Sequence, residues 1–146
     1  MTIRPAVASD VPEIVTMAEA FVSSTEYRTI LALDAQKVGE LATGLIDSPD
    51  GVVLVAQGAG GDLIGMLALC VFEHPMSRER VAGELVWWVS PDRRGRAGGA
   101  LFVAGERWVR DQGAAVWHMI APTPEVEAIY AQRGFEKVET AYQRRM

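Results

Sequence analysis

The chain has 146 residues, of which 49% are hydrophobic and 23% are charged, and its formal net charge is −5. This length supports one core, so we assign residues 1–146 to a single domain. An acidic chain repels nucleic-acid phosphate, so we expect no nucleic-acid partner. No apolar stretch approaches the roughly 18 residues that span a membrane, and Asp10 and Pro12 interrupt any early apolar run. We therefore expect a cytoplasmic protein without a membrane partner.

The spacing of apolar residues predicts strands that alternate with helices. Asp10 and Glu13 have the spacing of a capping box at the start of the first helix, and Asp34 is the expected N-cap of the second. Thr123, followed by a proline, marks the start of the last helix, which Gly134 ends. In chain order we expect strands at residues 2–4, 52–56, 63–72, 83–89, 114–120, 135–138 and 141–145, and helices within residues 11–21, 35–47, 101–111 and 124–133. This order is that of a mixed α/β sheet.

The stretch from Glu84 to Ala100 leads from an apolar strand into a loop with three arginines and three glycines, and then into an amphipathic helix. Small residues leave backbone N–H groups uncovered, and the helix N-terminus adds about half a positive charge. We therefore expect an anion site, most naturally for phosphate. Arg93, Arg94 and Arg96 cluster here in an otherwise acidic chain, which favours an anionic ligand over a solvated turn. The stretch has neither the lysine and hydroxyl of a P-loop nor the Gly-x-Gly-x-x-Gly of a dinucleotide site.

This stretch resembles the acyl-CoA-binding motif of the GNAT superfamily of N-acetyltransferases. The motif runs Val-x-Pro and then Arg/Gln-x-x-Gly-x-Gly/Ala. Residues 89–91 supply the first part and residues 94–99 the second, with Ala97 where the family usually has glycine. A second stretch, Tyr130 to Phe135, matches the family signature Leu-Tyr-x-x-x-Gly-Phe about 30 residues further on. Where many members carry an asparagine, this chain has Thr123, so a contact of that asparagine to the cofactor would be lost or replaced.

The resemblance implies the GNAT fold, an α/β (α+β) domain with a mixed central sheet of about six to seven strands and about four flanking helices. It looks closest to small single-domain bacterial or phage members. It also implies acetyl-CoA as cofactor and CoA as product. A bulge in the strand at residues 83–89 would splay it from the strand at 114–120, and pantetheine would lie between them. The N–H of Val89 would bind the oxyanion. The loop donors to the CoA pyrophosphate would be the N–H groups of Arg94, Gly95, Arg96, Ala97, Gly98, Gly99 and Ala100.

Two side chains are candidates for the acid and the base of acyl transfer. An attacking amine must lose a proton, and the leaving thiolate gains one. The resemblance assigns the acid to Tyr130, and the alternative for this residue is an aromatic side chain that fills the core. Glu84 is our candidate base, because an acid in an apolar strand is costly if it is buried unpaired. An exposed strand-end carboxylate is the alternative for Glu84, and Glu73, His74 or a water molecule are the other candidate bases.

We therefore predict an acetyl-CoA-dependent N-acetyltransferase, an acyltransferase in which a primary amine attacks directly in a ternary complex without a metal ion. Cys70 lies in an apolar run and is expected to pack in a strand rather than to act as a nucleophile. The acceptor stays open among a small amine, an antibiotic, and a protein N-terminus or lysine. Residues 22–33 and 73–82 are irregular and are expected to carry acceptor specificity.

Three alternatives to this function stay open. The first alternative is a non-catalytic acyl-CoA-binding sensor or scaffold. The second is an enzyme that transfers another acyl group, and the third is an enzyme that acylates an oxygen acceptor. A homodimer formed through the closing strands is a further expectation.

Overall fold

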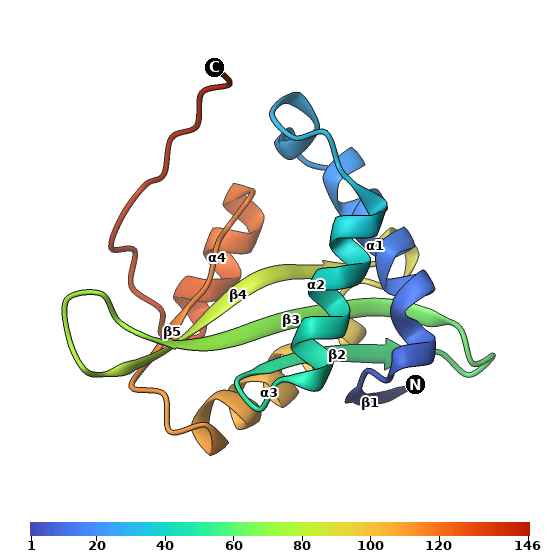
Figure 1. Ribbon diagram of the computed structural model, residues 1–146, viewed down its shortest axis with the longest axis horizontal. Coiled ribbons are helices and arrows are strands. Elements are labelled where there is room, and N and C mark those ends of the chain that lie inside the picture. Colours follow the sequence, from blue (N-terminus) through green and yellow to red (C-terminus); the bar gives the residue numbers. More distant parts are fainter.

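The computed structural model describes all of residues 1–146 and consists of one five-stranded sheet with helices on both faces (Figure 1). The strands are β1 (Thr2–Pro5), β2 (Gly51–Gln57), β3 (Leu63–Glu73), β4 (Arg80–Val89) and β5 (Val116–His118). The helices are α1 (Val11–Ser23), α2 (Ala35–Asp47), α3 (Arg96–Asp111) and α4 (Pro124–Gln132), and short 3-10 turns are η1 (Ala8–Asp10), η2 (Glu26–Thr29) and η3 (Pro91–Arg93).

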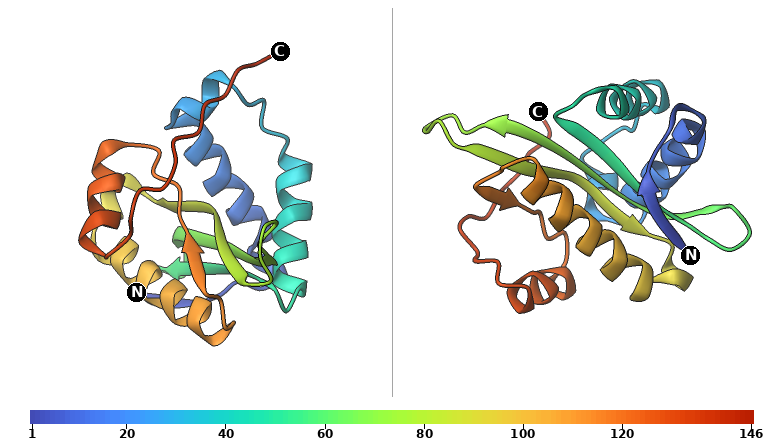
Figure 2. Two further views of the ribbon diagram at one scale, coloured as in Figure 1. Left: turned by 90° about the vertical axis from the view of Figure 1, so that its left-hand side faces the viewer. Right: turned by 90° about the horizontal axis from the view of Figure 1, so that it is seen from below.

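The strands lie in the sheet in the order in which they occur in the chain. Neighbours from β1 to β4 are antiparallel, and β5 runs parallel to β4. Helices α1 and α2 cover one face, and α3 and α4 cover the other, as the edge-on view shows (Figure 2). The crossover through α3 brings the start of that helix to the end of β4, so this crossover positions the predicted anion loop. No helix combines the length and apolar character that crossing a membrane requires.

Each face of the sheet carries its own apolar cluster, because side chains alternate along the strands. Met66 packs with residues of α1 and α2, whereas the neighbouring Leu67 packs with residues of α3. Trp87 and Trp88 divide in the same way, as their position in a regular strand predicts. Met66, Leu67 and Leu101 are almost completely buried, and each such side chain contributes roughly 2 kcal/mol relative to an exposed one.

Most helix ends follow the predicted signals. The carboxylate of Asp34 accepts the N–H of the residue three positions on, at 3.0 Å, and Thr123 makes the same contact at 3.5 Å. Gly113 and Gly134 follow α3 and α4 with φ of +66° and +83°, which glycine adopts without steric cost.

The predicted capping box at the start of α1 is wrong. Asp10 precedes α1, but its carboxylate accepts two bonds from the guanidinium of Arg4, at 2.7 and 3.0 Å, and one from the N–H of Val7. The carboxylate of Glu13 instead accepts the N–H of Leu63 from the β2–β3 hairpin. A bidentate pair with a guanidinium is stronger than a single bond from a backbone N–H of the helix, which explains the outcome. The Arg4 guanidinium also holds the pKa of Asp10 below its usual range.

The two predicted closing strands, at residues 135–138 and 141–145, do not form. The chain after α4 has no regular structure (Figure 1). Phe135 packs against the rings of Phe102, Trp117 and Tyr130, and the residues beyond it run along the outside of the domain. The apolar residues Phe135, Val138 and Tyr142 do not alternate, so they define no strand face to bury, and Val138 and Tyr142 are 81% and 93% exposed. The sheet therefore has five strands rather than six or seven. The α/β class, the mixed sheet and the four helices are confirmed.

Gly51 packs against the end of α2 and allows a direct test of this packing. A Cβ atom at position 51 would lie 2.9 Å from the carbonyl oxygen of Leu45. We expect Gly51→Ala to lower the free energy of unfolding by about 1–3 kcal/mol in urea titrations. Gly44, within α2, is the matched control, because no atom lies within 4 Å of its added Cβ. Gly44→Ala should raise stability by about 0.5–1 kcal/mol. A Gly51→Ala variant as stable as the natural protein would contradict this packing.

Candidate active site

Strands β4 and β5 separate part-way along β4. They pair only over Val81–Gly83. Just beyond, the register between β3 and β4 shifts, and Leu85 is the extra residue of a bulge. From Glu84 to Val89, the edge of β4 that points away from β3 has no strand partner. The predicted bulge and the predicted splaying of these two strands are therefore both present.

Glu84 and Tyr130 meet at Ile120, two residues after β5 ends. The carboxylate of Glu84 accepts the N–H of Ile120 at 2.9 Å, and the hydroxyl of Tyr130 donates to the carbonyl oxygen of Ile120 at 3.2 Å. Both side chains are buried, at 8% and 7% exposure. The indole of Trp87 stacks on the Tyr130 ring with the centroids 5.9 Å apart. The structure thus brings the two predicted catalytic side chains together at the backbone of one residue, Ile120.

The two groups differ widely in proton affinity. Burial raises the pKa of Glu84 to about 7, although hydrogen bonds from the backbone at Ile120 and Trp87 favour its charged form. Burial also raises the pKa of Tyr130, and the negative charge of Glu84 raises it further. Near neutral pH, Tyr130 is a proton donor and Glu84 exchanges readily between its two forms. One acid and one acceptor of protons therefore face the same point.

The loop after β4 presents uncovered backbone donors. The N–H groups of residues 94–98 donate to no other group of the chain, whereas the N–H of Gly99 donates to the carbonyl oxygen of Gly95 at 2.9 Å. Gly95 has φ of +86°, a backbone conformation that favours glycine. The methyl group of Ala97 is buried in the core and so leaves the loop open. Together with the N-terminus of α3, these donors suit an anion.

The open edge of β4 also offers a donor at Val89. The N–H of Ser90 points toward β3 and donates to the carbonyl oxygen of Ile64 in that strand at 2.9 Å. Because successive N–H groups of a strand point to opposite edges, the N–H of Val89 points toward the gap between β4 and β5.

A cavity of about 30 Å³ lies beside this gap. Its walls come from α1, η2, β4, α4 and the segment after β5. The lining residues are Phe21, Tyr27, Glu84, Leu85, Trp87, Ile120, Pro122, Val126 and Tyr130. Glu84 and Tyr130 therefore face a common space.

The sequence model of the Acetyltransferase (GNAT) family matches residues 16–135 of the chain. The chain belongs to the GNAT family of acetyltransferases. Its membership supports transferase activity and accounts for the sheet, the loop and the gap described above. No protein with a curated description matches the sequence.

Solved GNAT structures share the fold at low sequence identity. A ribosomal-protein-alanine N-acetyltransferase from Brucella melitensis is 17% identical over 100% of both chains, with a TM-score of 0.74. An acetyltransferase from Trypanosoma brucei is 16% identical over 99% of both chains, with a TM-score of 0.77. An aminoglycoside acetyltransferase from a soil metagenomic sample is 19% identical over 98% of this chain and 95% of its own, with a TM-score of 0.71.

In this GNAT domain, the other candidate bases lie away from the cavity. Glu73 ends β3, and His74 lies in the hairpin turn, where its Nδ1 accepts the N–H of Met76 at 3.1 Å. Strand β4 begins at Arg80, earlier than predicted, so Glu84 is inside the strand rather than near its start. Of the two segments expected to carry specificity, residues 22–33 contribute Tyr27 to the cavity wall and residues 73–82 contribute nothing.

Sequence reasoning missed three residues of this GNAT site. Ile120 holds both catalytic candidates through its backbone, which has no sequence signal, and Phe21 looks like any apolar helix residue. Arg133 has its guanidinium 4.6 Å from the centroid of the Phe102 ring. Its Nη2 is 3.9 Å from the position of a Cβ at Gly99, so it adds positive charge beside the first turn of α3. Its place next to the predicted end of the last helix was the only available signal.

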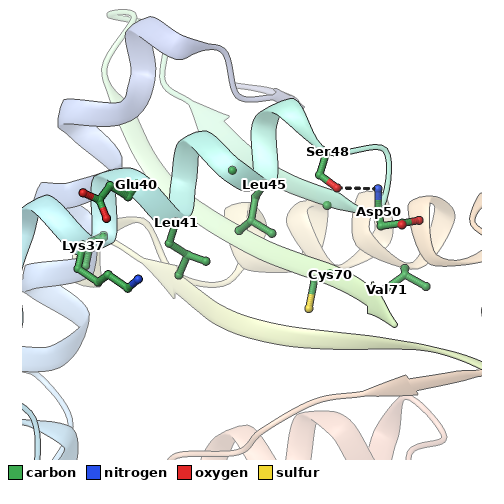
Figure 3. A pocket seen from close by; sticks show the side chains of 11 residues that line it. Lys37, Glu40, Leu41, Leu45, Ser48, Asp50, Cys70 and Val71 are labelled. Carbon is green, nitrogen blue, oxygen red and sulfur yellow. Dashed lines mark hydrogen bonds between the residues drawn. The ribbon is translucent and has the colours of Figure 1, made fainter. Parts of the chain in front are cut away.

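A larger depression of about 500 Å³ lies between α2 and the sheet, and Cys70 is in its wall (Figure 3). It contains neither Glu84 nor Tyr130. Burial raises the pKa of the Cys70 thiol, so the thiol stays protonated and is a poor nucleophile near neutral pH. The structure therefore agrees with the expectation that Cys70 packs in a strand.

The raised pKa of Glu84 predicts a pH-dependent effect on stability. An unfolded glutamate has a pKa of about 4.3, so the folded state binds the proton more tightly. The stabilisation from this carboxyl is complete below that value and is lost as the pH rises through about 7. The free energy of unfolding of Glu84→Gln, measured relative to the natural protein in urea titrations, should therefore be about 2 kcal/mol higher at pH 8 than at pH 5.

The exposed Glu127 on α4 supplies the control for this experiment. Glu127→Gln should change stability by less than about 0.5 kcal/mol at both pH values. An equal effect of Glu84→Gln at pH 5 and pH 8 would show that burial does not shift the Glu84 carboxyl.

Proposed function

We propose that this GNAT protein transfers an acetyl group from acetyl-CoA to a primary amine by direct attack in a ternary complex. The observation that carries the proposal is the meeting of Glu84 and Tyr130 at Ile120, in the wall of one cavity. Amide formation from an amine and a thioester needs one group that accepts a proton and one that donates a proton. Near pH 7, Tyr130 carries a proton that it can donate and Glu84 can accept one, which suits that need.

The features around the cavity suit the binding of acetyl-CoA. The free N–H groups of residues 94–98 form a cradle for a pyrophosphate at the start of α3. Arg96 and Arg133 would add positive charge there. The unpaired edge of β4 offers hydrogen bonds to an extended amide chain such as pantetheine. The N–H of Val89 is the proposed donor to the thioester oxygen, which becomes negatively charged during attack.

The proton movements follow from the two side chains. Acetyl-CoA would supply the acyl group as a thioester. Glu84 would accept a proton from the incoming ammonium, either directly or through a water molecule. Tyr130 would donate its hydroxyl proton to the sulfur that leaves. Direct transfer is favoured over a covalent acyl-enzyme because Cys70, the only cysteine, is outside the cavity.

The first test is binding. Acetyl-CoA and CoA should raise the melting temperature, and ATP should not. A ligand at a hundredfold excess over Kd stabilises the fold by about 2.7 kcal/mol. Arg96→Glu should weaken CoA binding by tenfold or more in calorimetry. A glutamate in the first turn favours the helix itself, so the variant should stay folded.

Arg107→Glu, on the same helix and about 16 Å along it, is the matched control and should bind CoA within about twofold of the natural protein. Equal losses of CoA affinity in the two variants would mean that net charge, and not the position of Arg96 at the loop, determines the affinity. The absence of any shift with acetyl-CoA and CoA would overturn the proposed cofactor.

The second test is catalysis, followed as release of the CoA thiol in the presence of amines. Tyr130→Phe should lower kcat by about a hundredfold or more while acetyl-CoA binding is retained. In the natural protein, kcat/KM should rise with pH through about 7 and then level off, as Glu84 loses its proton. Glu84→Gln should lower the rate and remove that inflection.

Binding of acetyl-CoA without turnover of any amine would favour the alternative of a non-catalytic sensor. An unchanged pH profile in Glu84→Gln would mean that another group accepts the proton.

A further inference from the structure

The walls of the cavity beside Glu84 are apolar and aromatic. Phe21 and Tyr27 form one side, with their ring centroids 5.5 Å apart. Leu85 and Ile120 also line the cavity and are 43% and 44% exposed, so the cavity borders solvent at these residues. Glu84 is the only residue with a carboxylate or a basic group among those that line the cavity. An acceptor that enters here therefore meets one negative charge and several hydrocarbon surfaces.

The cavity wall itself offers little to a polycationic acceptor. Glu26 lies next to Tyr27 in the chain, but its carboxylate is 3.2 Å from the guanidinium of Arg28. A polyamine or an aminoglycoside carries several ammonium groups, and each would need a carboxylate or open water. The cavity wall supplies one carboxylate, Glu84. It therefore gives no advantage to an acceptor with more than one charge.

The walls also offer little to a peptide. A protein N-terminus brings peptide N–H and C=O groups within two bonds of the reacting amine, and buried polar groups need partners. Beside Glu84, the hydroxyls in the wall are those of Tyr27 and Tyr130, and the latter donates to Ile120. A peptide backbone would find no side-chain partners on Phe21, Leu85 and Pro122, and the unpaired edge of β4 is taken up by pantetheine in the proposed function.

From these walls we propose that the acceptor is a small monoamine carried on a short apolar or aromatic body, held by Phe21 and Tyr27. This proposal rests on the proposed function and names the substrate class of that site. The space of about 30 Å³ fits an amino group and little more, so the body lies along the aromatic pair toward solvent. The aromatic side chains of Phe21 and Tyr27 would also attract the ammonium before it loses its proton.

The reaction balances with the groups present. The amine nitrogen forms a bond to the acetyl carbon, and the bond from that carbon to sulfur breaks. Of the two protons that the ammonium loses, one leaves through Glu84 to solvent. The other replaces the proton that Tyr130 gives to the sulfur. The products are an N-alkyl acetamide, CoA and one proton.

The test measures kcat/KM at saturating acetyl-CoA for a panel of amines. A homologous series from ethylamine to pentylamine should gain about fourfold per added methylene until the wall is filled. Phenethylamine should exceed ethanolamine, spermidine, kanamycin and an alanine tetrapeptide by tenfold or more. Propylamine against ethanolamine is the matched pair, because the two molecules have similar size and differ in polarity.

Variants of the aromatic pair test where the body lies. Tyr27→Ala should lower the ratio of phenethylamine to methylamine turnover by about tenfold. Tyr27→Glu adds a second carboxylate and should shift preference toward spermidine. Tyr142→Ala is the control, since Tyr142 is 93% exposed in the C-terminal tail and should leave the panel unchanged. Binding of acetyl-CoA with the affinity of the natural protein, measured by calorimetry, is the check that each variant is folded.

The outcomes separate the two proposals. Faster turnover of spermidine, kanamycin or the tetrapeptide overturns the apolar acceptor class and leaves the proposed function intact. A flat response along the alkyl series also overturns it. If acetyl-CoA binds and no amine of any class is acetylated, the proposed function itself fails.

Discussion

The site depends on how one buried carboxylate is satisfied. Glu84 lies inside an apolar strand, where an unpaired charge would be costly. At this position β4 is no longer paired with β5, so the β5 ladder provides no hydrogen-bond donor for the carboxylate. The N–H of Ile120 supplies that bond, and the carbonyl of the same residue accepts from Tyr130. The backbone of Ile120 therefore ties the chain between β5 and α4 to both side chains. It brings the carboxyl of Glu84 and the phenol of Tyr130 to one residue beside the gap.

An open strand edge is normally a liability in a folded protein. Here the edge of β4 is free because Leu85 interrupts the regular ladder just where β5 ends. The same crossover from β4 through α3 to β5 places the helix N-terminus beyond the end of the open edge. In sheets with parallel strands, ligands bind at the carboxyl ends of the strands. The gap and the anion loop are thus two consequences of one connection, and they lie where a long ligand with an anionic end would need them.

The sequence carried those features that have local causes. Caps at Asp34 and Thr123 and the alternation of Trp87 and Trp88 follow from neighbouring residues, so they were predictable. The hydrogen bonds of Asp10 were not predictable, because Arg4 of β1 competes with the helix for its carboxylate. The tail after Gly134 was assigned strands from composition, although its apolar residues lack the spacing of a strand face. Ile120 had no signal at all, since its role lies in its backbone. Phe21 and Tyr27 reach the site only through tertiary packing.

This difference explains why the two halves of the site are unequally readable. The proposed cofactor half consists of backbone N–H groups, and these require small residues in a fixed pattern, so a motif records them. The proposed acceptor half consists of ordinary apolar side chains of α1 and η2, which look like core residues in the sequence. A ribosomal-protein-alanine acetyltransferase and an aminoglycoside acetyltransferase of the GNAT family share this fold at 17% and 19% identity. The fold therefore says little about the acceptor, and the chemistry of the cavity wall is the better guide to it.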